Sequence, residues 1–125
     1  MGNKLQTKKS KKPSRKSLTN KLDKLVSEVV RLKGKCQRCG KRETLQACHI
    51  FSRTYRSVRW YLKNLLCLCA GCHFWAHKNP ILFAEFVQSL YTKEGYEELK
   101  RLAQVTKRWQ VWELQELVKK FQQML

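Results

Sequence analysis

Apolar residues recur at three- and four-residue spacing near the start of the chain, which is the pattern of an amphipathic helix. This apolar face consists of Leu18, Leu22, Leu25, Val26, Val29 and Leu32. The pattern predicts a helix over about 19–33, capped by Thr19 or Asn20 and ended by Gly34. Residues 1–17 are rich in Lys and Ser without apolar periodicity, so we expect a disordered basic arm. This arm either becomes ordered on DNA or is a solvated tail without a specific role.

Two short strands are predicted in the middle of the chain, over residues 44–50 and 62–68, with a basic, aromatic loop between them. A tight turn that contains two cysteines, residues 36–40, precedes the first strand. A second such turn, residues 69–72, follows the second strand and leads into a short helix over 73–78. With two strands among several helices, the expected fold class is α+β.

Further helices are predicted beyond Asn79-Pro80, where a cap residue precedes Pro at the first helical position. Their ranges are about 80–91, 94–106 and 108–124. The first carries one apolar stripe, formed by Phe83, Phe86, Val87 and Leu90. The last is expected to bury Trp109, Trp112, Leu114, Leu117 and Phe121. Because these aromatic residues recur at helical spacing, packing in the core is favoured over stacking on nucleic-acid bases.

The charge of the chain points to a polyanionic partner. The formal net charge is +18, and residues 1–20 hold seven Lys or Arg and no acid. Residues 21–125 still carry a net charge of +11, from twenty basic and nine acidic residues. Neutralising phosphates releases counterions, so such a chain binds nucleic acid in a salt-dependent way. A solubilising surface, or attraction to a membrane surface, is the alternative interpretation.

The sequence also bears on the compartment. No stretch approaches the 18 or more apolar residues that a membrane span requires, so no membrane partner is expected. The N-terminus is basic and polar without an apolar segment behind it, which is not the pattern of a secretory signal. We therefore expect a cytoplasmic, reducing location. There the six cysteines are metal ligands or free thiols rather than disulfides.

Four cysteines have the spacing of a structural zinc site. Cys36 and Cys39 form one Cys-x2-Cys pair, Cys69 and Cys72 form a second, and 29 residues separate the two pairs. Each pair bends the backbone so that two sulfurs converge, and two pairs complete a tetrahedral site that leaves no position for substrate. Cys67 is an alternative to Cys69, but only Cys69 has the two-residue spacing to Cys72. We therefore assign Cys67 to a buried apolar position.

The three histidines, His49, His73 and His77, lie in a segment without carboxylates between Glu43 and Glu85. His73 and His77 are four residues apart on a predicted helix, so both imidazoles face the same side and can share one ion. Any catalytic ion in this segment must be held by His, Asn or Cys rather than by paired carboxylates.

The order Cys-x2-Cys, His49, Asn64, Cys-x2-Cys-His73-x3-His77 resembles the motif of the HNH (ββα-metal) endonucleases. It resembles especially the small zinc-stapled HNH proteins of phages, including NinG-like recombination proteins. The matching part runs from about Cys36 to Pro80. The resemblance implies a ββα-metal (His-Me finger) core with a four-Cys zinc site, flanked by an N-terminal helix and C-terminal helices. A single domain over 18–125 then comprises this core, over 36–80, and a helical extension over 80–124.

The resemblance also implies roles for individual residues. His49 matches the general base that deprotonates the attacking water. Asn64 matches the residue that braces the loop and orients the base or touches the metal. His73 and His77 match ligands of a catalytic divalent ion such as Mg²⁺, Mn²⁺, Ni²⁺ or Zn²⁺. Cys48 stands where the family often has a metal-binding Asp or His; as a ligand it favours Zn²⁺ or another soft ion, and otherwise water completes the shell.

The implied activity is hydrolysis of DNA phosphodiester bonds, in phage recombination or DNA processing, with 5′-phosphate and 3′-hydroxyl products. Basic residues around the loop are candidates for binding flanking DNA phosphates, namely Arg53, Arg56, Arg59 and Lys63. A generic basic surface explains them equally well. The competing functions are a non-catalytic zinc-finger module that binds DNA and an accessory factor that has lost activity. The apolar stripes of the C-terminal helices fit docking on the core, a homodimer, or a phage protein partner.

Overall fold

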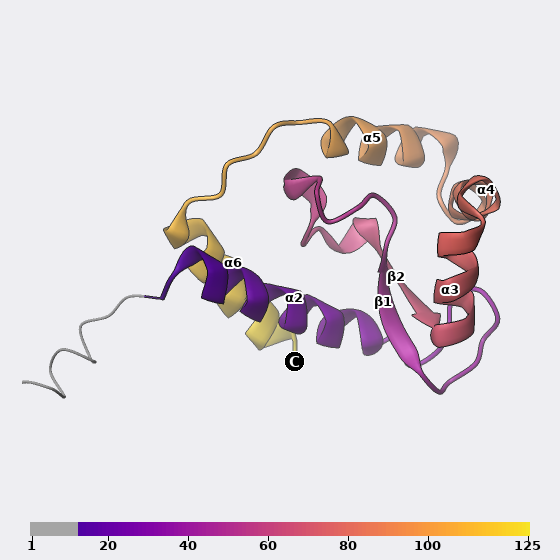
Figure 1. The fold of residues 1–125 in the computed structure, drawn as a ribbon, viewed down its shortest axis with the longest axis horizontal. Helices are drawn as coiled ribbons and strands as arrows, with labels where there is room; N and C mark the ends of the chain where they lie inside the picture. Colours follow the sequence, from indigo (N-terminus) through magenta and orange to yellow (C-terminus); the bar gives the residue numbers. More distant parts are fainter. Residues whose placement is uncertain (1–12) are drawn as a thin grey trace, which may run out of the picture.

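The structure, a computed structural model, describes residues 13–125. Residues 1–12 of the predicted basic arm lie outside this range. The described chain has an α+β fold with five α-helices and one antiparallel sheet of two strands (Figure 1). Within residues 13–125, no helix combines the length and the apolar character that crossing a membrane requires.

The first helix, α2, spans Arg15–Arg31 and begins earlier than the sequence pattern predicts. Ser14 caps it, because the Ser14 side chain accepts a hydrogen bond from the backbone N–H of Ser17 at 3.0 Å. The prediction of Thr19 or Asn20 as cap is therefore wrong, and residues 15–17 are helical rather than part of a disordered arm. One face of α2 is buried, formed by Leu18, Leu22, Leu25, Val26, Val29 and Val30.

The sheet pairs β1, Leu45–His49, with β2, Leu65–Cys69, in antiparallel register. His49 lies opposite Leu65, so the end of β1 is next to the start of β2. Two short 3-10 helices, η1 (Arg56–Val58) and η2 (Leu62–Asn64), lie in the connection. Because residues 62–64 form η2, the second strand starts three residues later than predicted.

Helix α3, Ala70–Lys78, follows β2 directly and starts three residues before the predicted short helix. The three C-terminal helices are α4 (Pro80–Leu90), α5 (Lys93–Ala103) and α6 (Val111–Met124). Their existence confirms the prediction, although α6 begins at Val111 rather than near residue 108. A reciprocal capping box between Gln110 and Glu113 sets that start.

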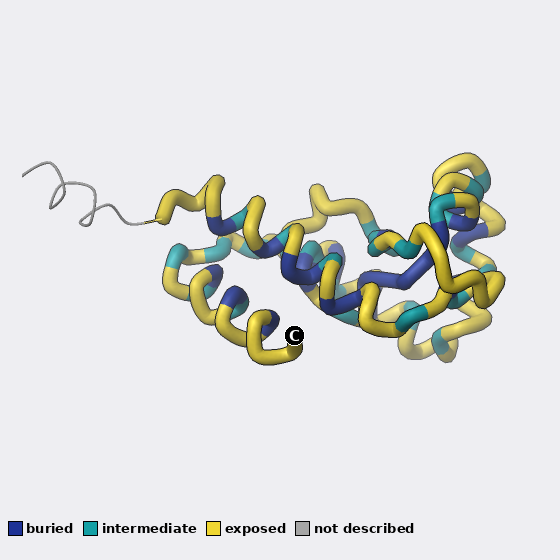
Figure 2. The backbone as a smooth tube through the Cα atoms, turned by 90° about the horizontal axis from the view of Figure 1, so that it is seen from below, coloured by how far each residue is buried: buried dark blue, intermediate teal, exposed yellow. Residues whose placement is uncertain are grey.

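The sheet separates two clusters of buried side chains. On one side, α2 and α6 pack against each other and against Trp60, Leu65 and Cys67 (Figures 1 and 2). On the other side, the cysteines of the zinc motif pack with Leu66, Leu68 and the α4 residues Phe83 and Val87. Trp112 was expected in the core but is 65% exposed, because α6 turns Leu114, Val118 and Phe121 inward instead.

Candidate functional site

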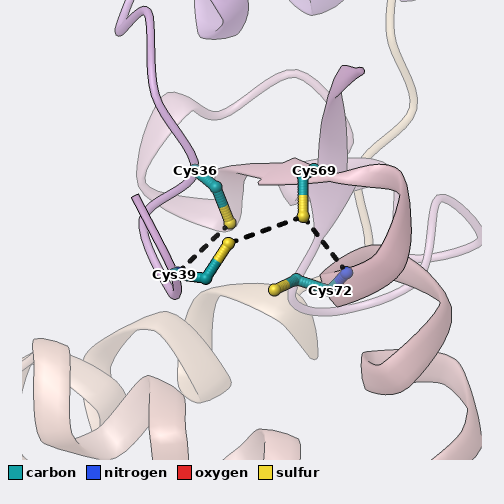
Figure 3. Close-up of side chains that lie close together, drawn as sticks. All are labelled: Cys36, Cys39, Cys69 and Cys72. Carbon is teal, nitrogen blue, oxygen red and sulfur yellow. Dashed lines mark hydrogen bonds between the residues drawn. The ribbon is translucent and has the colours of Figure 1, made fainter. Parts of the chain in front are cut away.

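The four cysteines of the two Cys-x2-Cys pairs converge as the spacing predicts. The Sγ atoms of Cys36, Cys39, Cys69 and Cys72 all lie within 4.8 Å of one another (Figure 3). The Sγ atoms of Cys39 and Cys69 are 3.7 Å apart. Tetrahedral zinc with Zn–S bonds of about 2.3 Å separates its sulfurs by roughly 3.8 Å. The cluster therefore has the donor set and the spacing of a structural zinc site, and all six cysteines of the chain are free of disulfides.

Local backbone geometry favours the thiolate form of one of these cysteines, Cys36. The backbone N–H groups of Arg38 and Cys39 point at Cys36 Sγ, at 3.4 and 3.5 Å. Burial raises the pKa of Cys36, but these hydrogen bonds outweigh it and lower the pKa to about 6. These hydrogen bonds favour the Cys36 thiolate, which is the form that binds zinc.

Arg38 is a further part of the cysteine cluster that the sequence analysis missed. Its Nη1 lies 3.4 Å from Cys72 Sγ, and its guanidinium lies 3.5 Å from the centroid of the Trp75 ring. The positive charge offsets the negative charge of the thiolates, and the stacked ring holds it in place. No local pattern reveals this, because the contacts join the first turn to α3.

The two remaining cysteines are outside the cluster. Cys67 is fully buried in the core beside α2, as predicted. Cys48 is 2% exposed and packs in the cluster that contains Leu66, Phe83 and Val87. Burial raises the pKa of Cys48 to about 12, so it stays a neutral thiol. Within residues 13–125, Cys48 belongs to no group of three or more Cys, His or acidic side chains whose ligand atoms are close enough to share an ion.

A cavity of about 780 Å³ brings all three histidines of the chain together, His49 from β1 and His73 and His77 from α3. We refer to it as the histidine cavity. The connection between the strands lines it with Arg53, Arg56 and Arg59. Lys63 differs from these arginines, because it lines a separate pocket of about 280 Å³ with Tyr61 and Tyr91. Three of the four predicted DNA-contacting residues therefore share a surface with the histidines.

His49 is held in one tautomer. Its Nε2 lies 2.9 Å from the backbone carbonyl oxygen of Arg59. Because a carbonyl only accepts, Nε2 carries the hydrogen and donates it, which leaves the Nδ1 lone pair free. Burial lowers the pKa of His49, and the charge of Arg53 acts in the same direction. The imidazole is therefore neutral at neutral pH and can accept a proton at Nδ1.

His73 and His77 form a pair on one face of α3, with ring centroids 4.9 Å apart. His73 Nδ1 lies 2.7 Å from Oε1 of Gln46, which also only accepts, so the Nε2 lone pair of His73 is free. Burial, together with the neighbouring His77, lowers the pKa of His73 and keeps it neutral. Gln46 comes from β1, and the sequence analysis missed it because only the packing of α3 on the sheet brings it to His73.

Asn64 braces the loop that follows His49. Its side chain is fully buried, and Nδ2 donates to the carbonyls of Phe51 at 2.9 Å and Val58 at 3.1 Å. Oδ1 accepts from the N–H of Phe51 at 2.8 Å. These bonds use both amide hydrogens and the oxygen within the chain. Asn64 therefore joins Phe51 to Val58 and holds this loop in place.

Replacing Asn64 by alanine is expected to lower the free energy of unfolding by about 3 kcal/mol. The substitution leaves two carbonyls and one N–H in the loop without their partners. Urea denaturation of the zinc-loaded protein, followed by circular dichroism, measures the loss, with the exposed Asn20→Ala on α2 as control. A change for Asn64→Ala no larger than that of the control would show that the brace is unimportant.

Asp23 lines the histidine cavity and is a further residue that the sequence analysis missed. Its carboxylate accepts from Nε of Arg59 at 3.1 Å, from Nη2 of Arg59 at 2.7 Å and from Nε1 of Trp60 at 2.9 Å. Burial raises the pKa of Asp23, but the hydrogen bonds from Arg59 and Trp60 outweigh it and lower the pKa. Asp23 lies on α2, far in sequence from the acid-free segment, and tertiary packing alone brings it to the cavity.

Comparisons of this chain with protein-family models, with curated proteins and with solved structures found no match. The resemblance to the HNH motif therefore stays a prediction from the sequence. What the molecule itself offers is a four-cysteine cluster and a cavity lined by three histidines and three arginines.

Proposed function

We propose that this chain is a metal-dependent DNA endonuclease of the HNH (ββα-metal) type that hydrolyses phosphodiester bonds at the histidine cavity. The observation that carries the proposal is the 2.9 Å hydrogen bond from His49 Nε2 to the Arg59 carbonyl. It leaves a neutral nitrogen lone pair, Nδ1, on a side chain that lines a cavity with two further histidines and three arginines. A fixed base beside candidate metal ligands and phosphate-binding cations is what metal-assisted phosphodiester hydrolysis requires.

The order of elements around the cavity supports the proposal. Two antiparallel strands are followed directly by a helix, which is the order of elements that the proposed ββα-metal type requires. His49 ends β1, Asn64 immediately precedes β2, and the His73–His77 pair lies on α3. The four-Cys cluster ties the first turn to the start of α3 and so fixes the helix against the sheet.

His49 is the proposed general base. Its Nδ1 takes the proton from the attacking water while Nε2 stays bonded to the Arg59 carbonyl. The backbone carbonyl also stabilises the imidazolium that forms, because it accepts from the N–H that becomes more acidic. A positioned base of this kind accelerates hydrolysis by about 10²- to 10⁴-fold.

His73 and His77 are the proposed ligands of a divalent ion. Both offer nitrogen donors, and the bond from His73 Nδ1 to Gln46 fixes the ring with Nε2 free, as the outer partners of metal-binding histidines do. Two imidazoles leave positions for phosphate oxygens and water, and they favour Ni²⁺ or Zn²⁺ over Mg²⁺. When bound, the ion supplies positive charge to the scissile phosphate and to the leaving oxygen.

Arg53 and Arg56 are the proposed contacts to phosphates that flank the cleavage site. Both are exposed at the histidine cavity, and the net charge of +18 favours a polyanion throughout the chain. DNA is therefore the proposed substrate. A role in phage recombination or DNA processing, in the cytoplasm of the host, follows from the NinG-like resemblance of the motif.

Replacing Gln46 by alanine is expected to raise the Mn²⁺ concentration needed for half-maximal DNA cleavage by about 10- to 100-fold. The rate at saturating Mn²⁺ stays near that of the wild type, because Gln46 holds a ligand and does not touch the substrate. His73→Ala removes the ligand itself and abolishes cleavage. Conversion of supercoiled plasmid across a Mn²⁺ series measures both effects. The control is Gln115→Ala, an exposed residue on α6. An unchanged Mn²⁺ requirement in both Gln46→Ala and His73→Ala would refute this ion site.

A further inference from the structure

Among the residues that the structure describes, Asp23 is the only acid that lines the histidine cavity. Its presence there needs an explanation, because a carboxylate repels the phosphates that the cavity is proposed to bind. It also neutralises Arg59, which would otherwise attract the substrate. Asp23 therefore weakens DNA binding, and we expect it to contribute to the reaction in another way.

The carboxylate of Asp23 holds two consecutive residues of the loop. Oδ1 accepts from Arg59 Nε at 3.1 Å and from Trp60 Nε1 at 2.9 Å, and Oδ2 accepts from Arg59 Nη2 at 2.7 Å. The Asp23 and Arg59 side chains are only 19% and 21% exposed, and Trp60 is buried. Charge-assisted, two-pronged bonds that are shielded from water are the strong class of hydrogen bond. A further contact, to Arg53 at 3.4 Å, is more exposed.

The peptide between Arg59 and Trp60 contains the carbonyl that accepts the hydrogen of His49 Nε2 at 2.9 Å. Asp23 therefore binds the side chains of the two residues that flank this peptide group, and the carbonyl of this group orients His49. We propose that Asp23 is a positioning residue: by holding Arg59 and Trp60 it fixes this carbonyl, and through it the tautomer and orientation of His49. The role of His49 as general base rests on the proposed function, whereas the positioning of its imidazole ring does not.

Packing of helix α2 in the core holds Asp23 in position. Asp23 follows Leu22, which is fully buried, and precedes Leu25 and Val26, which pack in the core between α2, α6 and the sheet. Position 23 lies outside residues 36–80, the part of the chain that carries the HNH-like motif. The N-terminal helix thus takes part in the site through the backbone of the loop, without touching the reacting atoms.

Two simpler roles for Asp23 fit the geometry less well. A metal-ligand role conflicts with the engagement of both oxygens by Arg59 and Trp60, and Asp23 is in no group of three or more ligands within residues 13–125. If Asp23 only formed a stabilising ion pair, its replacement would lower the stability of the protein and leave the turnover of the folded fraction unchanged. The positioning role predicts slower turnover in folded protein together with tighter DNA binding.

The first test is a split between kcat and KM. In zinc-loaded full-length protein, Asp23→Asn is expected to lower kcat for plasmid cleavage about 10- to 100-fold. KM for DNA falls, because one negative charge leaves the cavity. Glu28→Gln is the matched control, because Glu28 is an exposed acid on the same helix outside the cavity and its replacement changes the charge equally. Wild-type kcat in folded Asp23→Asn protein would overturn the proposal.

The second test does not depend on cleavage. Nitrogen-15 spectra of histidine-labelled protein contain only three imidazoles, which single histidine substitutions assign. Wild-type His49 is expected in the pure Nε2–H tautomer, and Asp23→Ala is expected to give mixed tautomers; if that variant does not fold, Asp23→Asn takes its place. Mixed tautomers in a chain that does not cut DNA would support the positioning and refute the proposed nuclease function. An unchanged tautomer in the folded variant would overturn the positioning.

Discussion

The Cys36→Ser variant is expected to lose its cooperative fold. The four sulfurs join the first turn to the start of α3, and three of the four cysteines are buried in the core cluster that also contains Leu66 and Leu68. Zinc binding to structural sites of small domains contributes about 10–16 kcal/mol of apparent free energy. A typical domain is stable by only about 5–15 kcal/mol, so one lost thiolate is enough to unfold it. Cys72→Ser is expected to behave in the same way.

Zinc content and thermal unfolding measure this effect, and Cys48→Ala is the matched control. Cys48 is as buried as Cys36 but lies outside the four-sulfur group, so its replacement removes similar packing and no ligand. We expect Cys48→Ala to bind one zinc ion and to unfold cooperatively, with a loss of about 1 kcal/mol. Equal zinc content and equal melting temperatures for Cys36→Ser and Cys48→Ala would contradict the structural zinc site.

The His49→Ala variant is expected to cut DNA about 10²- to 10⁴-fold more slowly than the wild type. The substitution removes the Nδ1 lone pair that the bond to the Arg59 carbonyl leaves free. His49 is half-buried at the edge of the sheet, so the fold and the affinity for DNA persist. Single-turnover cleavage of plasmid measures the rate, and the melting temperature and a DNA-binding titration test that the protein is intact.

Lys63→Gln is the companion variant for His49→Ala. Lys63 lines a pocket that is separate from the histidine cavity, so its replacement is expected to leave the rate of cleavage near that of the wild type. Cleavage that survives His49→Ala unchanged would remove His49 from the role of base. Loss of cleavage in Lys63→Gln as large as in His49→Ala, with DNA binding unchanged, would contradict the placement of the reaction in the histidine cavity.

The helices and strands were largely predictable from the chain, because their apolar residues follow local periods. The start of α2 was not predictable, because the Lys- and Ser-rich composition around it is typical of a disordered segment. The helix begins there because the Ser14 side chain accepts a hydrogen bond from the N–H of Ser17. Trp112 shows a second limit. Helical spacing predicts that a residue shares a face with its neighbours, but packing against α2 decides which face of α6 is buried.

Within the candidate site, the parts set by local spacing were predictable. The two Cys-x2-Cys turns and the His73–His77 pair lie within single turns of the chain. Gln46, Arg38 and Asp23 were not predictable, because each meets its partner across elements that only tertiary packing brings together. The three histidines come from a segment without acids, but the cavity that they line also contains the carboxylate of Asp23.

The decisive test of the proposed nuclease activity is incubation of the zinc-loaded protein with supercoiled plasmid and added Mn²⁺, Mg²⁺, Ni²⁺ or Zn²⁺. We expect nicked or linear plasmid with at least one of these ions and none without added ion, and ends that carry 5′-phosphate and 3′-hydroxyl groups. Intact plasmid under every ion, with tight and salt-sensitive binding of the same DNA, would contradict the nuclease and identify a DNA-binding module.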